Sequence, residues 1–203
     1  QVRALTHVLV PDECDVERTA ARTSVPALWW PPMVPERVIS TPSSPAVHRA
    51  GVFHGVPYGP REQWIHHPAL KSVLTFARSS APTLFQQLFD RLQQSAVQRL
   101  ATPAGMSADE LSHYTKMWHE VREGEFRESM TQLPQWAAIV NLPSLARFFG
   151  GRVFEGIAAG RPVVSYAVPG HPMNNGLFVD GEEILYFSPS RPESLAEVLE
   201  RLL

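Results

Sequence analysis

Gly151-Arg-Val-Phe-Glu-Gly-Ile-Ala-Ala-Gly-Arg-Pro-Val-Val164 is the stretch of sequence that decides the fold. Its first nine residues predict a short helix, and Gly160 follows as the glycine that ends it. Apolar, β-branched runs lie on both sides, at residues 136–142 (WAAIVNL) and 162–168 (PVVSYAV), and such runs are typical of buried strands. Together they predict a strand, helix and strand crossover.

The segments on either side extend this alternation. Residues 50–53 (AGVF) form a short predicted strand, which leads into a loop of glycines and prolines that ends at Arg61. A capping box from Ser190 to Glu193 predicts a last helix with one apolar face. Strands that alternate with helices predict an α/β fold, namely a Rossmann-like parallel sheet flanked by helices.

The middle of the chain is predicted to be helical. From residue 68 to about residue 135 the chain is mainly helix-forming, and LFQQLFDRLQQSAVQRL carries Leu and Phe at helical spacing. Ser107 to Glu110 resembles the N-terminal cap of a second helix in this segment. We expect these helices to be packing elements.

The first part of the chain predicts a small separate unit. Residues 4–10 and 25–30 are apolar runs that each end at proline, with a polar helix-forming segment between them. A proline-rich linker follows. We therefore expect residues 1–35 to be the tail of an N-terminal domain with its linker, and residues 36–203 to be a C-terminal domain. Because residue 1 is Gln, we expect the chain to be a piece of a longer protein.

The composition is that of a globular protein. The 203 residues are 44% apolar and 19% charged, which excludes disordered and collagen-like chains. A net charge of -2 gives no electrostatic reason to expect a nucleic-acid partner. The single cysteine, Cys14, cannot form an internal disulfide, and no transmembrane segment or signal peptide is recognised, so we expect a cytoplasmic protein.

Chemistry is expected at the carboxyl edge of the sheet, where ligands of open α/β sheets bind. Three loops are predicted there, at residues 54–61, 144–152 and 169–176. In the second loop, Gly150 and Gly151 immediately precede a helix, so unpaired backbone N–H groups and the positive end of the helix dipole create an anion site.

Arg152 and Glu155 are three residues apart in this helix, hence on the same side. The pair suits a ligand that carries phosphate and sugar, since Arg can bind a diphosphate bidentately and Glu can accept hydrogen bonds from ribose hydroxyls. Alternatively, the two residues form a surface ion pair, which is the simpler interpretation of the spacing.

No metal site is predicted from the sequence. His113 and His119 are six residues apart, a spacing that does not place two imidazoles on one helical face, and no Cys or carboxylate ligands cluster near them. His171 is interpreted as an ordinary loop residue.

The stretch from Gly151 to Val164, with the later segment Asn175-Gly-Leu-Phe-Val-Asp-Gly-Glu-Glu183, resembles the donor-binding signature of GT-B glycosyltransferases. In that family a helix of the pattern R-x-F-E-x-x-A-x-G-x-P-V binds the nucleotide ribose through its Glu and approaches the diphosphate with its first basic residue. The resemblance places Arg152 and Glu155 in these two roles.

Two further segments carry the resemblance. Residues 50–61 are similar to the start of the family's C-terminal domain, which implies phosphate contacts by Gly55, Tyr58 and Arg61. A second group stands where the family's next loop approaches the donor's sugar and phosphates, although Asn-Gly is equally an ordinary turn pair. This group is Asn174, Asn175 and Gly176.

One position departs from the family pattern. Many relatives carry a second glutamate, but the residue eight before Glu155 is Arg147. The chain resembles the spore-maturation-like branch in this respect, which keeps the R-x-F-E portion alone.

The resemblance implies a glycosyltransferase, which transfers a sugar from a nucleotide diphosphate sugar to the hydroxyl of an unidentified acceptor. This chain would supply the donor-binding half, with no cofactor and no metal. The general base of such enzymes usually lies in the N-terminal domain, so no catalytic residue is assigned. Two alternatives stay open: a nucleotide-sugar epimerase, which shares the architecture, and a non-catalytic nucleotide-binding or assembly module.

Overall fold

The computed structural model describes most of the chain, namely residues 6–39, 45–55, 57–77, 84–100, 105–145 and 148–203. The backbone contacts divide it into two compact units. The first combines Gln1–Ala77 with Leu133–Leu203, and the second is Arg78–Gln132. A domain boundary at residue 35 stays a prediction.

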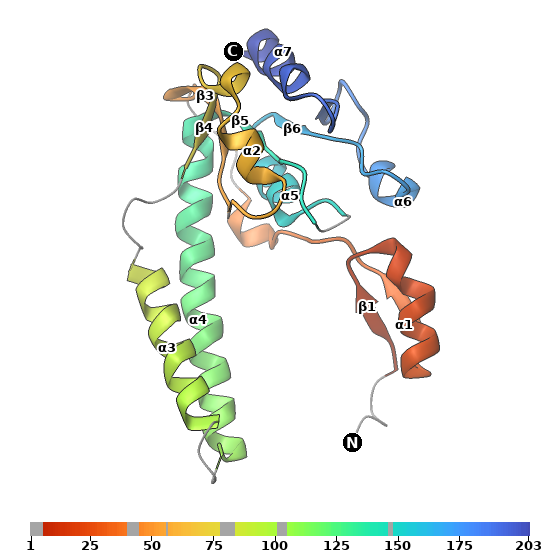
Figure 1. The fold of residues 1–203 in the computed structure, drawn as a ribbon. Coiled ribbons are helices and arrows are strands. Elements are labelled where there is room, and N and C mark those ends of the chain that lie inside the picture. Colours follow the sequence, from red (N-terminus) through yellow and green to blue (C-terminus); the bar gives the residue numbers. More distant parts are fainter. Residues whose placement is uncertain (1–5, 40–44, 56, 78–83, 101–104, 146–147) are drawn as a thin grey trace. The chain divides into compact units, whose positions relative to one another are not determined.

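A five-stranded sheet forms the centre of the first unit (Figure 1). Its strands, in spatial order, are β4 (Leu74–Phe76), β3 (His48–Phe53), β5 (Trp136–Val140), β6 (Val163–Ser165) and β7 (Leu185–Tyr186). All neighbouring strands are parallel. The predicted Rossmann-like parallel sheet is therefore confirmed.

The strand order reverses between β3 and β5. From β3 the chain runs through α2 (Arg61–Ile65) to β4 at one edge, whereas from β5 it runs through α5 (Gly151–Ala158) to β6 on the other side. In doubly wound sheets, ligands bind beside the carboxyl ends of the strands at such a reversal. The loops that follow β3 and β5 lie at this switch point.

The chain ends in α7 (Pro192–Leu202), which buries apolar residues as predicted. The predicted capping box is wrong. The N-cap residue is Arg191, and no side chain caps this end of the helix. The Ser194 hydroxyl accepts a hydrogen bond from the Ser188 N–H at 2.9 Å, so the preceding turn is fixed by a different serine.

A helix packs closely against each face of the sheet. A Cβ atom at Gly156 of α5 would lie 2.9 Å from Ile139 of β5. A Cβ atom at Gly51 of β3 would lie 2.7 Å from Leu199 of α7. Gly51 is in register with Ala138, and successive strand residues face opposite sides, so α5 and α7 cover opposite faces.

Strand β4 corrects the prediction of a mainly helical segment after residue 68. Only Pro68–Leu70 forms a short 3-10 helix there, and Leu74–Phe76 pairs with β3, with Gly51 opposite Leu74. Three residues are too few to show the alternation of a strand, and this strand depends on its neighbour for its hydrogen bonds.

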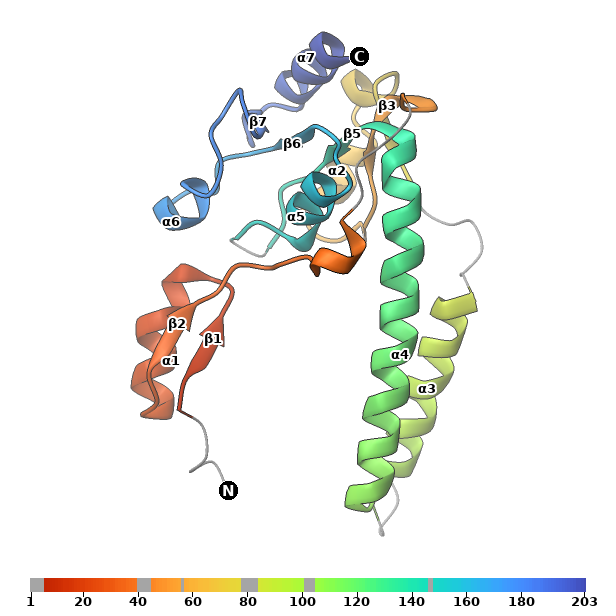
Figure 2. The same cartoon turned by 180° about the vertical axis from the view of Figure 1, so that it is seen from behind.

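The predicted strand, helix and strand near the start of the chain is confirmed (Figure 2). Strand β1 (Val8–Val10) pairs in parallel with β2 (Ala27–Trp29), and α1 (Val16–Thr23) connects them. The remaining short helices are η2 (Glu13–Asp15), η3 (Glu36–Val38), η4 (Pro68–Leu70), η5 (Leu133–Gln135) and α6 (Pro172–Asn175).

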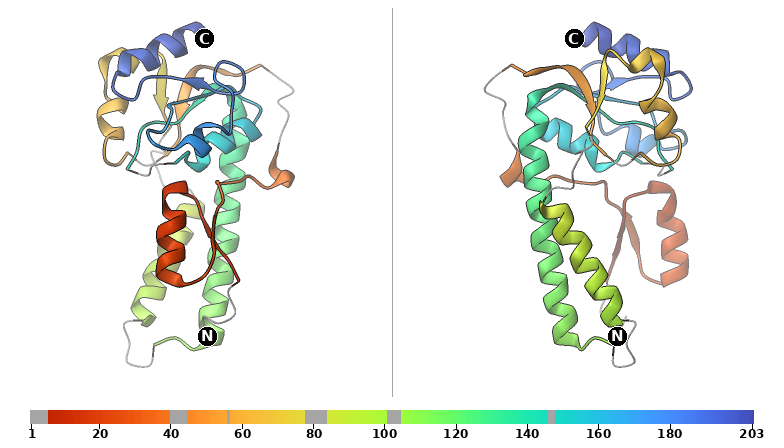
Figure 3. Two further views of the ribbon diagram at one scale, coloured as in Figure 1. Left: turned by 90° about the vertical axis from the view of Figure 1, so that its right-hand side faces the viewer. Right: turned by 60° about the vertical axis from the view of Figure 1, so that its left-hand side comes forward.

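The second unit is a helical hairpin of α3 (Leu84–Leu100) and α4 (Ala108–Gln132), as Figure 3 shows. An Arg99–Glu110 ion pair at 2.6 Å joins the two helices. The predicted cap of α4 is confirmed, because the Ser107 hydroxyl accepts the Glu110 N–H and the Glu110 carboxylate accepts the Ser107 N–H. No helix among the described residues combines the length and the apolar character needed to span a membrane.

Candidate functional site

Arg61 follows the loop after β3, and its guanidinium lies near two aromatic rings. The Arg61 guanidinium lies 4.5 Å from the centre of the Tyr58 ring and 5.3 Å from that of Phe53, distances at which cation–π attraction operates. Gly55 lies in the same loop, where a Cβ atom would come within 2.9 Å of the Phe53 ring. Of the three residues predicted in this loop, Gly55 and Arg61 therefore both approach the Phe53 ring, and Arg61 also approaches Tyr58.

The loop after β5 leads to the N-terminus of α5. Gly150 is the N-cap residue, and no side chain caps the helix. A Cβ atom at Gly151 would lie 3.0 Å from Oε1 of Glu155, so the carboxylate folds back toward the first turn. The first N–H groups and the positive end of the helix dipole lie at this glycine pair, as predicted. Arg147 lies outside the described residues.

Arg152 and Glu155 form an ion pair, with Nη1 and Oε2 2.6 Å apart. The ion-pair interpretation is confirmed, but the pair is not at the surface, since the two side chains are only 20% and 16% exposed. Burial lowers the pKa of Arg152, while the charges of Glu155 and Arg61 raise and lower it respectively. The two guanidinium groups thus lie close enough to repel each other.

His54 joins this group from the loop after β3. Burial, and then the positive charge of Arg152, lower the pKa of His54 to about 4, so the imidazole is neutral at pH 7. The sequence pattern of this loop did not indicate a role for His54. His54 therefore lies within the field of the Arg152 guanidinium, which in turn lies within that of Arg61, and fixed positive charges of this kind favour an anion.

The third predicted loop contains helix α6, and its Asn-Gly pair closes that helix instead of forming a turn of its own. Gly176 is the C-cap residue, with a φ of -80°. The Asn175 side chain binds the backbone of Val168 twice, accepting its N–H and donating to its carbonyl, each at 2.8 Å. Asn175 therefore shapes the loop.

Asn174 connects the third loop to the second. Its side chain is 1% exposed, and its Oδ1 accepts the N–H of Phe149 at 2.9 Å. Its Nδ2 is buried and has no hydrogen-bond partner among the described residues. Because Phe149 immediately precedes Gly150, Asn174 helps to hold the segment that leads into α5.

Residues between β1 and α1 reach the same loop. The Glu13 carboxylate accepts the N–H groups of Met173 and Asn174, at 3.2 and 2.6 Å. His171 lies in the loop before α6, as expected, but it contacts a distant segment of the chain. Its side chain is buried, and its Nε2 lies 3.0 Å from Oδ1 of Asp12. These contacts join segments about 160 residues apart, which local sequence patterns do not reveal.

Comparison with known proteins gives a family and distant similarities to solved structures. The family model described as "Glycosyl transferases group 1" matches residues 72–203. The crystal structure of Anabaena Alr3699/HepE in complex with UDP is similar at 12% identity and a TM-score of 0.46, over 97% of this chain and 53% of that one. This chain thus spans about half the length of that protein. Among curated proteins, no match was found.

Proposed function

The chain belongs to the glycosyl transferases of group 1, and we propose that it binds the nucleoside diphosphate part of a nucleotide sugar at the switch point of its sheet. One observation supports this most strongly: Arg152 lies in the first turn of α5, and Arg61 is close enough for its charge to lower the pKa of Arg152. A diphosphate brings the opposite charge, and both guanidinium and backbone N–H groups bind phosphate oxygens well.

The ion pair between Arg152 and Glu155 is compatible with this role. A guanidinium has five N–H donors, and Glu155 is bound to Nη1, so Arg152 can keep its partner and still donate to a phosphate. We propose that the Glu155 carboxylate binds the ribose hydroxyls with its remaining acceptor capacity. Gly55, Tyr58, Gly150 and Gly151 would line the path of the diphosphate.

Asn174, Asn175 and Gly176 are proposed to bound the donor from the third loop. Asn174 has a buried amide N–H without a partner among the described residues, and Asn175 fixes the strand end from which this loop departs. Their contribution would be to position the loop, with Gly176 ending α6.

In the proposed reaction, the oxygen of the acceptor hydroxyl forms a bond to the anomeric carbon of the donor. The bond from that carbon to the diphosphate oxygen breaks, and the diphosphate leaves with the electron pair. Negative charge grows on the departing oxygen, where fixed positive groups stabilise it. Arg61, Arg152 and the dipole of α5 would supply this stabilisation. The proton of the acceptor hydroxyl goes to a general base, and we propose that the acceptor and this base lie on an N-terminal domain.

A titration with matched nucleotides tests the proposed site. UDP, GDP, ADP and TDP, each with its monophosphate, are titrated into the chain by calorimetry. At least one diphosphate should bind, and more tightly than its monophosphate, because the second phosphate adds charge opposite the two guanidinium groups. Failure of every diphosphate to bind would contradict the proposal and favour an assembly module.

A product assay on the complete enzyme distinguishes the two enzyme classes. The enzyme is incubated with the nucleotide sugar whose diphosphate binds, with and without candidate acceptors. Release of nucleoside diphosphate that depends on the acceptor is the expected result. Recovery of the nucleotide sugar with an inverted sugar centre would instead identify an epimerase.

A further inference from the structure

Three potential metal ligands lie together in the first compact unit. Asp12 and Cys14 precede α1, and His171 precedes α6. One ligand atom from each residue lies within 4.8 Å of the other two. Nε2 of His171 is 3.0 Å from Oδ1 of Asp12 and 3.5 Å from Sγ of Cys14.

The orientation of His171 directs a lone pair into this cluster. The side chain is 3% exposed, and its Nδ1 lies 2.8 Å from the carbonyl oxygen of Pro169. A carbonyl can only accept, so Nδ1 carries the hydrogen and Nε2 of the neutral ring carries the lone pair. Metal-binding histidines are typically held in this way, by a hydrogen bond from their other nitrogen.

The contact between His171 and Asp12 brings two potential ligand atoms together. With Nδ1 committed to Pro169, Nε2 and the Asp12 carboxylate present lone pairs to each other at 3.0 Å. A metal ion between these two atoms would be bound by both of them. The sulfur of Cys14 also lies near Nε2 and supplies a third ligand atom. A simple ion pair between His171 and Asp12 would not need this third atom, whereas a metal site would.

The three ligand types select the metal. Nitrogen, sulfur and carboxylate oxygen together suit Zn²⁺, whereas Mg²⁺ and Ca²⁺ prefer oxygen ligands alone. Tetrahedral bonds of about 2.1 Å to nitrogen and 2.3 Å to sulfur place those two atoms about 3.6 Å apart. The distance in this structure is 3.5 Å. Three protein ligands leave a fourth position for water.

We propose that Asp12, Cys14 and His171 bind a zinc ion, which fastens the segment before α1 to the loop before α6. Glu13 already joins the same two segments through the N–H groups of Met173 and Asn174, so the metal would reinforce an existing contact. The proposal does not depend on the identity of the nucleotide donor.

Zinc affinity tests the site directly. The reduced chain is titrated with Zn²⁺ in competition with a chromophoric chelator, and the same is done for Cys14→Ser, Asp12→Asn and Asp15→Asn. Cys14 is exposed, so its replacement disturbs no core packing. Asp15 is the matched control, because it lies in the same segment and pairs with Arg18. We expect one tight site, at least a tenfold loss in the first two variants, and no change in Asp15→Asn.

Two further readouts exclude binding at other histidines. Co²⁺ in place of Zn²⁺ should give thiolate-to-cobalt absorption that Cys14→Ser lacks, and Zn²⁺ should raise the melting temperature of the parent chain and not of Cys14→Ser. Equal zinc affinity in parent and Cys14→Ser would overturn the proposal. So would the absence of both the absorption and the thermal shift, which would leave a protonated His171 beside Asp12.

Discussion

The switch point of the sheet and the cluster of Asp12, Cys14 and His171 collect groups of opposite character. At the switch point, Arg61 and Arg152 lie close enough for the charge of one to lower the pKa of the other. In the cluster, a carboxylate, a sulfur and an imidazole lone pair face one another. Packing holds like groups together in both places, and the first place suits an anion while the second suits a cation.

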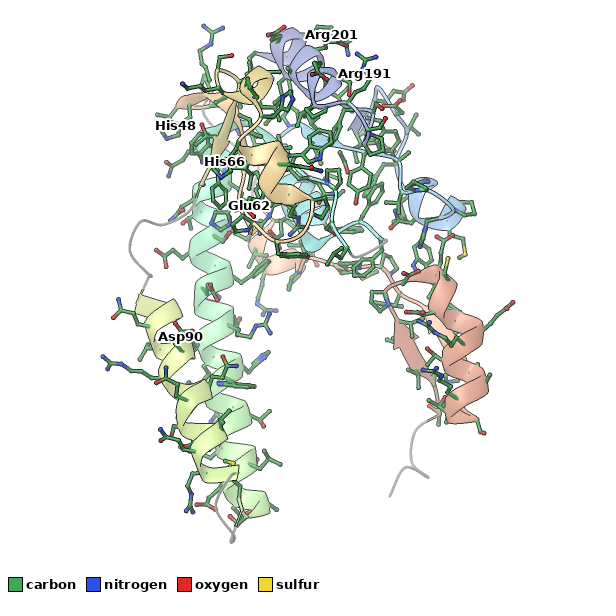
Figure 4. The ribbon with its side chains drawn as sticks, in the orientation of Figure 1. His48, Glu62, His66, Asp90, Arg191 and Arg201 are labelled. Atoms are coloured by element: carbon green, nitrogen blue, oxygen red, sulfur yellow. The ribbon has the colours of Figure 1, made fainter. Side chains whose placement is uncertain are left out.

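The largest effect is expected from Arg152→Ala. A charge-assisted hydrogen bond contributes about 1.5 to 3 kcal/mol, so loss of one or two such bonds should weaken diphosphate binding tenfold or more. Binding of the monophosphate should change less. Calorimetry measures both. Arg191→Ala is the control, because this side chain at the start of α7 is 60% exposed (Figure 4). Equal affinities of Arg152→Ala and the parent would rule out the anion site.

Glu155→Ala tests how much the ion pair with Arg152 contributes to the stability of the fold. The substitution removes the partner of Arg152 at a largely buried position, so the guanidinium charge is no longer compensated. The free energy of unfolding should fall by about 1 to 3 kcal/mol. For a chain of this length that corresponds to a melting temperature lower by roughly 2 to 12 °C. Scanning calorimetry measures the shift.

The double variant Arg152→Ala/Glu155→Ala is the control for this effect. It removes the stranded charge as well, so it should melt above the Glu155→Ala variant. Equal melting temperatures of Glu155→Ala and the parent would show that the pair contributes as little to stability as an exposed ion pair does.

His54 should make diphosphate binding depend on pH. Its pKa is about 4 in the free chain, and a bound anion should raise it toward the ordinary value of 6.5. A raised pKa means that the complex takes up a proton, so affinity should increase as the pH falls from about 6.5 toward 4. Between pH 7.5 and 5.5 the gain should reach about tenfold at most.

A matched variant isolates the contribution of the imidazole, since the diphosphate itself titrates near this range. His54→Gln should lose the part of the pH dependence that belongs to the side chain. Titration calorimetry at both pH values gives the difference. Identical pH profiles for the parent and His54→Gln would place His54 away from the bound anion.

The smallest expected effect is coupling between the two regions. The side-chain oxygen of Asn174 accepts the Phe149 N–H near α5, and the backbone N–H of Asn174 donates to the Glu13 carboxylate beside the cluster. Zinc should therefore strengthen diphosphate binding by about twofold to threefold, at the low end of about 0.5 to 2 kcal/mol. Asn174→Ala should remove this increase. A zinc effect that survives in Asn174→Ala would mean that the two regions communicate by another route.

The helix after β5 could be predicted because the residues that define its end and its faces are close together in the sequence. Gly160 ends α5 with a φ of +65°, and the spacing of Arg152 and Glu155 fixed their common side. The strands on both sides were recognisable for the same reason, since buried parallel strands are continuous apolar runs. Burial of the ion pair was not predictable, because it depends on how distant segments pack.

Features that depend on distant partners could not be predicted in this way. Strand β4 is only three residues long and is defined by its pairing with β3. The approach of Asp12 to His171 joins residues 159 positions apart. The low pKa of His54 results from burial and from Arg152, which lies almost a hundred residues later in the chain.

A crystal structure of the chain with a nucleoside diphosphate tests the central claim most directly. Phosphate oxygens should lie within hydrogen-bond distance of Arg61, Arg152 and the Gly151 N–H, with the ribose hydroxyls on Glu155. Ordered nucleotide at another surface, with the Arg152–Glu155 pair touching no part of it, would rule out the proposed donor site.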